Sequence, residues 1–210
     1  MTNFRAIRLG DLGHVLAITR GFPTQHAVPE GDVRVMSIAA LRNQTPAKLF
    51  ADRDAISVAG LRTAQAGDVL VAVEGGTVGE TMIVPADIDE FVPSQQVATI
   101  RIADDTLFPD PATALDPYYL GAWLSTEQAR EQIRRLARGS AIQRIPVADL
   151  ASVTVMIPPL EDQLAIGGRF QAFENAIRQH RAVTDHLQDL RDLDLVVTFA
   201  DAQAHNGAGA

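Results

Sequence analysis

The sequence contains no cysteine and only one lysine. The lack of cysteine excludes disulfide bonds and thiolate metal sites. The lysine, Lys48, follows Pro46 where a nuclease of the PD-(D/E)xK type would carry an acidic residue, so that nuclease chemistry is excluded. The five histidines show no ligand spacing typical of zinc sites, and we expect neither a metal ion nor a cofactor.

Long apolar segments are also missing. No run of about eighteen apolar residues occurs, so we expect no transmembrane helix. The first residues, MTNFRAIRLGDLGHVL, lack the apolar core of a secretion signal. The expected location is therefore the cytoplasm, without membrane contact.

Acidic residues outnumber basic ones, 26 to 18, which gives a formal net charge of −8. An acidic chain does not favour DNA binding, which depends on Lys and Arg that neutralise phosphates. The basic residues nevertheless gather in two segments. Residues 126–144 contain five arginines and two glutamates, and residues 42–62 carry one lysine and three arginines. The distribution leaves nucleic-acid binding open.

Short apolar runs between glycine- and proline-marked turns predict a sheet-rich body of mixed or antiparallel strands over the first 125 residues. The expected strands are residues 4–9, 33–38, 69–73, 81–84, 97–102 and 153–157. The glycines of residues 75–79 predict a tight connection between two of these strands. They do not open a helix, which argues against a nucleotide-binding turn.

A short helical segment is predicted around Ala39–Arg42, and further helices are predicted after residue 116. Pro117 suits a first helical turn, Ser125 or Thr126 can cap the next helix, and Gly139 is expected as its C′ residue. One long helix is expected from residue 160 to about Phe199, followed by a disordered tail at residues 200–210. The predicted fold class is therefore α+β, with a mixed-sheet domain over residues 1–159 and a helix over 160–199.

The long helix carries an apolar stripe with coiled-coil-like spacing. Its members are Ile166, Phe170, Phe173, Ile177, Val183, Leu187 and Leu190. A helix this long cannot bury such a seam against a small domain, so we expect a helical partner. The alternative is a helix that folds back onto its own domain.

One motif invites a catalytic interpretation. The sequence Asp116-Pro117-Tyr118-Tyr119 resembles the [DN]PP[YF] motif of amino-methyltransferases, but the second proline is missing. No glycine-rich motif for S-adenosylmethionine follows a strand at the expected distance. We therefore expect no catalysis by this chain.

Residues 139–166, GSAIQRIPVADLASVTVMIPPLEDQLAI, resemble the end of a target recognition domain in type I restriction–modification specificity subunits. A Gly-Ser turn leads there to a strand that ends in Ile-Pro-Pro-Leu and to a helix that begins with Glu-x-Gln-x-x-Ile. Further similar segments follow the family order at residues 9–12, 65–71, 76–84, 94–97 and 118–124. The resemblance covers residues 5–195.

The resemblance implies a non-catalytic subunit that reads DNA and directs a partner methyltransferase, together with a restriction subunit in some systems. Such subunits usually carry two recognition domains separated by two antiparallel helices, whereas this chain has one of each. We expect a homodimer through the long helix that reads a bipartite site. The candidate DNA-binding residues are the polar and basic ones in expected loops: Arg42, Asn43, Gln44, Thr45, Lys48, Arg53, Arg62, Arg138, Ser140, Gln143 and Arg144.

The acidic charge keeps a second hypothesis open. A domain of the same fold can dock on a defence complex, or inhibit it, without reading bases. A titration against random-sequence duplexes, with and without the methyltransferase, distinguishes the two.

Overall fold

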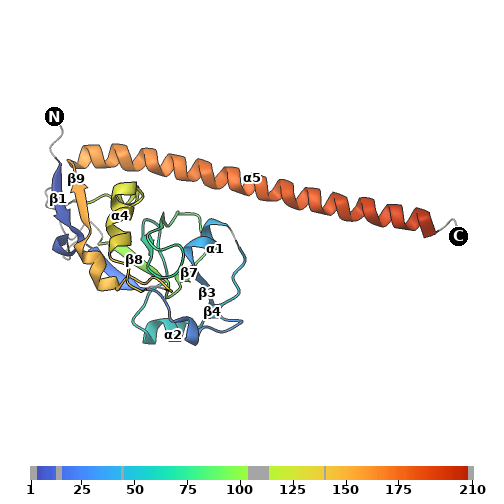
Figure 1. Ribbon diagram of the computed structural model, residues 1–210, viewed down its shortest axis with the longest axis horizontal. Helices are drawn as coiled ribbons and strands as arrows, with labels where there is room; N and C mark the ends of the chain where they lie inside the picture. Colours follow the sequence, from blue (N-terminus) through green and yellow to red (C-terminus); the bar gives the residue numbers. More distant parts are fainter. Residues whose placement is uncertain (1–3, 13–15, 44, 104–113, 140, 208–210) are drawn as a thin grey trace. The chain divides into compact units, whose positions relative to one another are not determined.

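The structure is a computed structural model that describes residues 4–12, 16–43, 45–103, 114–139 and 141–207, with side chains described up to residue 199. The chain divides into two compact units, Met1–Gln171 and Ala172–Ala210. The first unit holds all strands and the shorter helices, and the second consists of helix (Figure 1). Each unit is described by itself.

The largest sheet of the first unit has four antiparallel strands in the order β2-β8-β5-β6. Its strands are β2 (Leu16–Arg20), β8 (Val97–Ile102), β5 (Val69–Ala72) and β6 (Thr81–Ile83). Residues 75–79 connect β5 to β6, as predicted. Gly75 and Gly79 have φ angles of 90° and 86°, in the region that favours glycine.

Two smaller sheets complete the unit. The three-stranded sheet has the order β4-β3-β7, in which β3 pairs antiparallel with β4 and parallel with β7. The two-stranded sheet pairs β1 antiparallel with β9 (Figure 1). These strands are β3 (Val33–Met36), β4 (Phe50–Ala51), β7 (Phe91–Pro93), β1 (Arg5–Arg8) and β9 (Thr154–Ile157).

The helices begin where the sequence supplies caps. The side chains of Ser37, Asp116 and Thr126 accept hydrogen bonds from backbone N–H groups in the first turns of α1, α3 and α4. The α-helices are α1 (Ile38–Arg42), α2 (Arg53–Val58), α3 (Pro117–Leu124), α4 (Glu127–Arg135) and α5 (Leu160–Gly207). Among the described residues, short 3₁₀ segments occur at Leu9–Leu12, Thr24–His26 and Val147–Ser152.

The main core lies between the four-stranded sheet and helices α3 and α4. Val71 from β5, Leu120 from α3 and Ile133 from α4 are fully buried in it. Two smaller apolar clusters lie around Phe91 and Phe22. Burial of these side chains supplies the main driving force for folding of the unit.

The start of α5 is fixed to the first unit by Gln163, whose side chain is buried. Its amide nitrogen donates to the carbonyls of Ala114 and Pro158, and its amide oxygen accepts from the N–H of Asp116. One turn later, Gly167 lies so close to α3 that an added Cβ would be 2.3 Å from the Asp116 carboxylate. Residues 160–171 of α5 are therefore part of the first unit.

The predicted α+β class is confirmed, with three corrections to local structure. Gly139 is not the C′ residue of α4, because that helix ends at Arg135 with Leu136 as its cap. Strands β2, β4 and β7 and helix α2 were not predicted, since they are too short to show a clear period. Helix α5 continues to Gly207, beyond the predicted end at Phe199, and residues 208–210 lie outside the described part.

The domain boundary predicted at residue 160 differs from the division by contacts, which falls after Gln171. The anchored first turns of α5 account for this difference. Within the described residues, no helix has the length and apolarity needed to cross a membrane.

Candidate nucleic-acid interface

The first group of candidate residues lies at the end of α1. Arg42 is half-buried and forms an ion pair with Glu80 at 2.5 Å, while it also donates to the carbonyl of Thr81. Its guanidinium therefore connects α1 to β6. Asn43 is the exposed C-cap of α1, and Thr45 and Lys48 are exposed in the irregular segment that follows; Gln44 lies outside the described residues.

Arg53 and Arg62 lie at the two ends of the α2 region. Arg53 begins α2 and makes a two-pronged ion pair with Glu90, at 3.0 and 2.5 Å. The hydrogen bonds in this pair raise the pKa of Arg53 and lower that of Glu90. Arg62 is exposed in the segment after α2. Both cations face solvent, but Arg53 is already paired.

The third group lies in a tight turn between α4 and β9. Arg138 and Arg144 exchange backbone hydrogen bonds of 2.9 Å, and Gly139 between them has a φ angle of 99°. Gln143 is exposed at this turn. Ser140 lies outside the described residues. Gly139 thus serves this turn, which explains why a glycine occurs where a helix cap was predicted.

Tertiary structure brings the first and third groups to the same feature, the connection between β5 and β6. Arg144 forms an ion pair with Glu74 at 2.8 Å, and Glu74 directly precedes the glycines of this connection. Arg42 forms its ion pair with Glu80, which directly follows them. Arg53 pairs elsewhere, with Glu90 near β7. The candidates therefore form two separate areas.

Arg20 also belongs to the first area and was not predicted. It lies at the end of β2, forms an ion pair with Glu74 at 3.3 Å and donates to the carbonyl of Gln95. No local sequence signal identifies it, because its partner is 54 residues away. A single arginine before a Gly-Phe-Pro turn is typical of an exposed loop.

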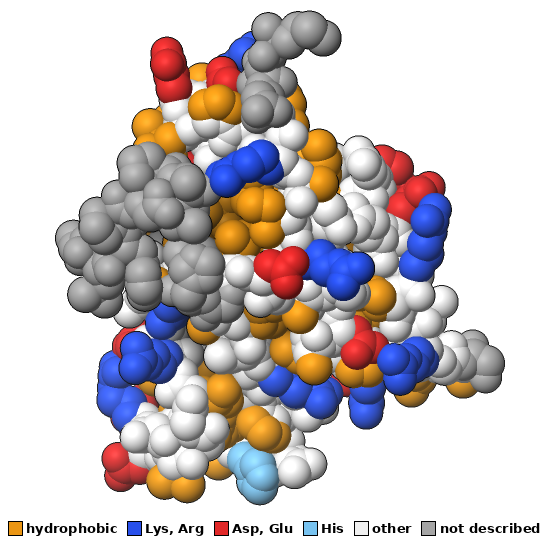
Figure 2. Space-filling view, turned by 90° about the vertical axis from the view of Figure 1, so that its left-hand side faces the viewer, with side chains coloured by type: hydrophobic (Ala, Val, Ile, Leu, Met, Phe, Trp, Pro, Cys, Tyr) orange, Lys and Arg blue, Asp and Glu red, His pale blue; other side chains and the backbone are white. Residues whose placement is uncertain are grey.

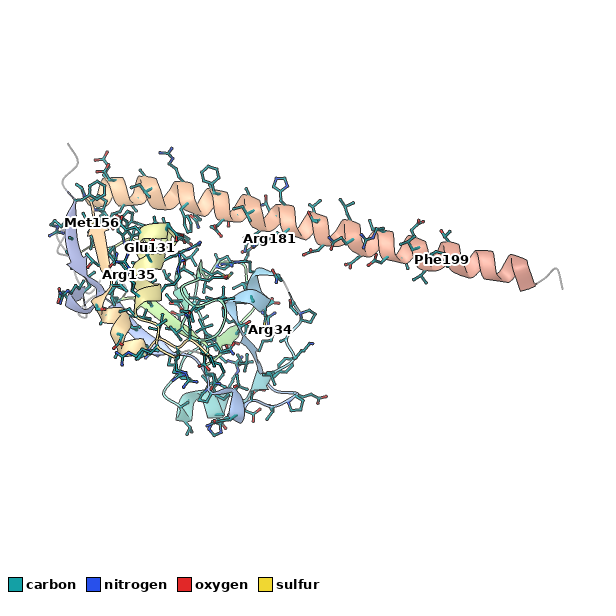
Figure 3. All side chains as sticks on the ribbon, viewed as in Figure 1. Arg34, Glu131, Arg135, Met156, Arg181 and Phe199 are labelled. Atoms are coloured by element: carbon teal, nitrogen blue, oxygen red, sulfur yellow. The ribbon has the colours of Figure 1, made fainter. Side chains whose placement is uncertain are left out.

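Carboxylates neutralise much of the positive charge at these positions. Arg138 pairs with Asp149 at 2.6 Å, and Glu131 pairs with Arg135 one turn apart on α4, where Figure 3 labels both. Figure 2 shows Lys and Arg side chains scattered among Asp and Glu side chains on the face that it presents. Acidic partners therefore balance the basic segments in the folded chain, and any local excess of positive charge extends over only two or three side chains.

The methyltransferase-like motif has structural roles. Asp116 caps α3 by accepting from the N–H of Tyr119, and desolvation raises the pKa of its carboxyl group. The Tyr119 hydroxyl donates to the carbonyl of Met156, and burial raises its pKa to about 12. Among the described residues, no group of three or more His, Asp or Glu side chains could hold a metal ion.

The predicted helix stripe divides between the two units. Phe170 is half-buried in the first unit, where an added Cβ on Gly121 would lie 3.5 Å from its ring. Ile166 is partly exposed on the same turns. The remaining members lie in the second unit and are exposed there: Phe173, Ile177, Val183, Leu187 and Leu190. Exposed apolar side chains continue along α5 to Phe199, which Figure 3 labels together with Arg181.

Comparison with known proteins gives one family and one fold. A family described as "Type I restriction modification DNA specificity domain" matches residues 1–188. No curated protein matches the sequence. Among solved structures, the S subunit of a type I restriction–modification system from M. genitalium superposes with a TM-score of 0.62 and 18% identity, covering 91% of this chain and 44% of that one.

A second similar structure was solved in work on complex assembly and conformational transition of a type I restriction–modification system. It superposes with a TM-score of 0.55 and 21% identity, covering 87% of this chain and 42% of that one. The chain thus spans less than half the length of these solved relatives. Sequence identities of 18% and 21% to these structures show a shared fold alone. The family match covers residues 1–188, and this chain therefore belongs to the type I restriction–modification DNA specificity family.

Proposed function

We propose that this chain recognises DNA as the specificity component of a restriction–modification or related DNA-modification system, without catalysing a reaction. The observation that carries the proposal is the family match, which extends through the mixed-sheet body and into α5 as far as residue 188. One recognition body followed by one helix is half of the usual arrangement described above. A partner methyltransferase would supply the chemistry, and a restriction subunit would join in some systems.

The recognition step is testable by selection from random-sequence duplexes. The full chain is mixed with the duplexes alone and in complex with its methyltransferase, and bound DNA is sequenced. Enrichment of a two-part sequence with a fixed gap is expected in the complex, because each body would contact one half-site. Absence of any enrichment in the complex would contradict DNA recognition.

We further propose that two copies pair through the second unit. Large apolar side chains are exposed along this helix, with 69% of Phe173, 60% of Leu187 and 63% of Phe199 accessible. Leaving such a stripe in water is unfavourable, and a second helix would cover it. A second copy of this chain is the occupant that we propose, because its own α5 would supply a matching apolar stripe together with complementary charges.

Charge along α5 favours an antiparallel pair. Between residues 169 and 181 the helix carries three arginines and one glutamate, whereas between 185 and 194 it carries four aspartates and one arginine. In an antiparallel pair the basic segment of one copy would lie beside the acidic segment of the other. A parallel pair would place like charges together, which is unfavourable.

Sedimentation of the full chain tests the dimer. The wild-type chain is expected to be a dimer, and Leu187→Asp to be a monomer because the new carboxylate would be buried without a partner. Gln188→Asp is the matched control, since it adds the same charge at the neighbouring exposed position. A wild-type chain that is monomeric, both alone and with its methyltransferase, would refute the pairing.

A second function has one observation in its favour. Arg42, Arg53, Arg138 and Arg144 each have a carboxylate partner, in a chain with a net charge of −8. A domain of this kind could dock on a defence complex, or inhibit it, without reading bases. The random-duplex selection separates the two, because a docking module would bind the complex and enrich no sequence.

A further inference from the structure

One carboxylate in the first unit holds two arginines that come from distant parts of the chain. Glu74 at the end of β5 accepts from Arg20 at 3.3 Å with one oxygen and from Arg144 at 2.8 Å with the other. The Glu74 side chain is only 11% exposed, whereas those of Arg20 and Arg144 are 48% and 57% exposed. We call these three residues the Glu74 cluster. The carboxylate of the cluster is mostly buried, and its two guanidiniums face solvent.

Backbone hydrogen bonds fix all three members of the cluster. The N–H of Gly75 donates to the carbonyl of Gln143 at 3.0 Å, and that of Ile145 to the carbonyl of Val73 at 2.8 Å. These bonds hold the Arg144 segment against the end of β5. Arg20 belongs to a paired strand, and its Nε also donates to the carbonyl of Gln95. The backbone that carries each guanidinium is therefore fixed, and the orientation of each guanidinium is restrained.

The Glu74 cluster carries a net positive charge, unlike the pairs around it. Two guanidiniums share one carboxylate, which leaves one unit of positive charge at physiological pH. The ion pairs Arg42–Glu80 and Arg138–Asp149 match one cation to one anion. A guanidinium has five N–H donors, and Arg20 and Arg144 use only some of theirs in hydrogen bonds to the described residues. The remaining donors can bind an anion.

The backbone beside the cluster is open. An added Cβ on Gly75 or on Gly76 would meet no atom within 4 Å. An approaching group would therefore find no side chain of the glycine connection in its way. Arginine binds phosphate through its planar fork of donors, and a cluster with a single positive charge matches a phosphodiester, which carries a single negative charge.

We propose that the Glu74 cluster binds a phosphodiester of the DNA backbone, with Arg20 and Arg144 as ligands and Glu74 as the positioning residue. This proposal rests on the proposed function, which it deepens. A phosphate contact of this kind would fix the position of the recognition body on the duplex without reading sequence. Of the two arginines, only Arg144 was predicted from the sequence as a DNA-binding residue.

The test measures binding of the full chain, alone and with its methyltransferase, to a labelled random-sequence duplex over a series of salt concentrations. Arg20→Ala and Arg144→Ala are each expected to weaken binding several-fold and to reduce the slope of log affinity against log salt by about 1. The loss of affinity is expected to be the same for duplexes of different sequence. Loss confined to one sequence would overturn the phosphate assignment in favour of base reading.

Three further variants separate geometry from charge. Gly76→Asp adds a carboxylate where no atom is in contact, so it is expected to leave the melting temperature unchanged and to weaken DNA binding. Glu74→Gln adds one positive charge but releases both arginines, and it is expected to weaken binding. Tighter binding by Glu74→Gln would overturn the positioning role of Glu74. Arg144→Lys keeps the charge, and it should weaken binding because the fork is lost.

The matched controls are Arg135→Ala and Glu131→Gln, which change the charge by the same amounts in an exposed pair on α4. They are expected to bind DNA as the wild type does. If the wild type binds DNA and the Glu74-cluster variants bind equally well, the cluster proposal is wrong and the proposed function stands. If the wild type binds no DNA even in the complex, both are wrong.

Discussion

Replacement of Gln163 by leucine is expected to weaken the attachment of α5 to the first unit. The side chain is 1% exposed and makes three hydrogen bonds to backbone groups: to Ala114 at 3.1 Å, to Pro158 at 3.0 Å and from Asp116 at 2.9 Å. Leucine has a similar volume, so the variant removes the polar contacts without leaving a large cavity. The change therefore isolates the hydrogen bonds.

The magnitude follows from the groups left without partners. A buried backbone donor or acceptor without a hydrogen bond costs about 1–3 kcal/mol. Three such groups imply a loss of about 3–9 kcal/mol, with the lower values applying where water reaches the half-buried Asp116 segment. The whole stability of a domain is about 5–15 kcal/mol. For a unit of this size each kcal/mol lowers the melting temperature by about 2–4 °C, so the variant is expected to lose roughly 6 °C or more.

Urea unfolding followed by circular dichroism measures the loss. Gln179→Leu is the control, because this glutamine is exposed on α5 and its replacement should change the free energy of unfolding by less than about 0.5 kcal/mol. A loss below about 1 kcal/mol for Gln163→Leu would refute the reasoning, since it would mean that the three backbone groups find other partners.

Three other predictions test the packing and electrostatics of the first unit. Gly167→Ala is expected to lower the melting temperature because its Cβ would be 2.3 Å from the carboxylate that caps α3, whereas Gly168→Ala, with no atom within 4 Å, should raise it slightly. Burial raises the pKa of Tyr119 from 10.0 to about 12, so the folded state retains this proton more tightly and stability should fall as the pH rises through that range; Tyr119→Phe should flatten this fall in urea titrations at several pH values. Asp68→Ala should cost about 3–5 kcal/mol in urea unfolding, because it leaves the half-buried Arg101 without its carboxylate; a loss similar to that of an exposed ion pair would contradict this.

The sequence alone determined the features that depend on neighbouring residues. The cap at Thr126, the glycine connection after β5 and the start of α5 after Pro158-Pro159 are all encoded within a few positions. The apolar stripe of α5 also follows from local spacing. Together these features were sufficient for the α+β class and for the resemblance to a family, because turn chemistry and periodicity act over short separations.

Only the tertiary structure decided which charges meet. Arg144 and Arg20 lie 70 and 54 residues from Glu74, and Arg42 lies 38 residues from Glu80. These pairs depend on strand order and register, which place β2, the β5–β6 connection and the turn before β9 side by side. The parallel pairing of β3 with β7 has the same origin. Local sequence contains no information on such long-range partners, because the burial of the core determines which segments come together.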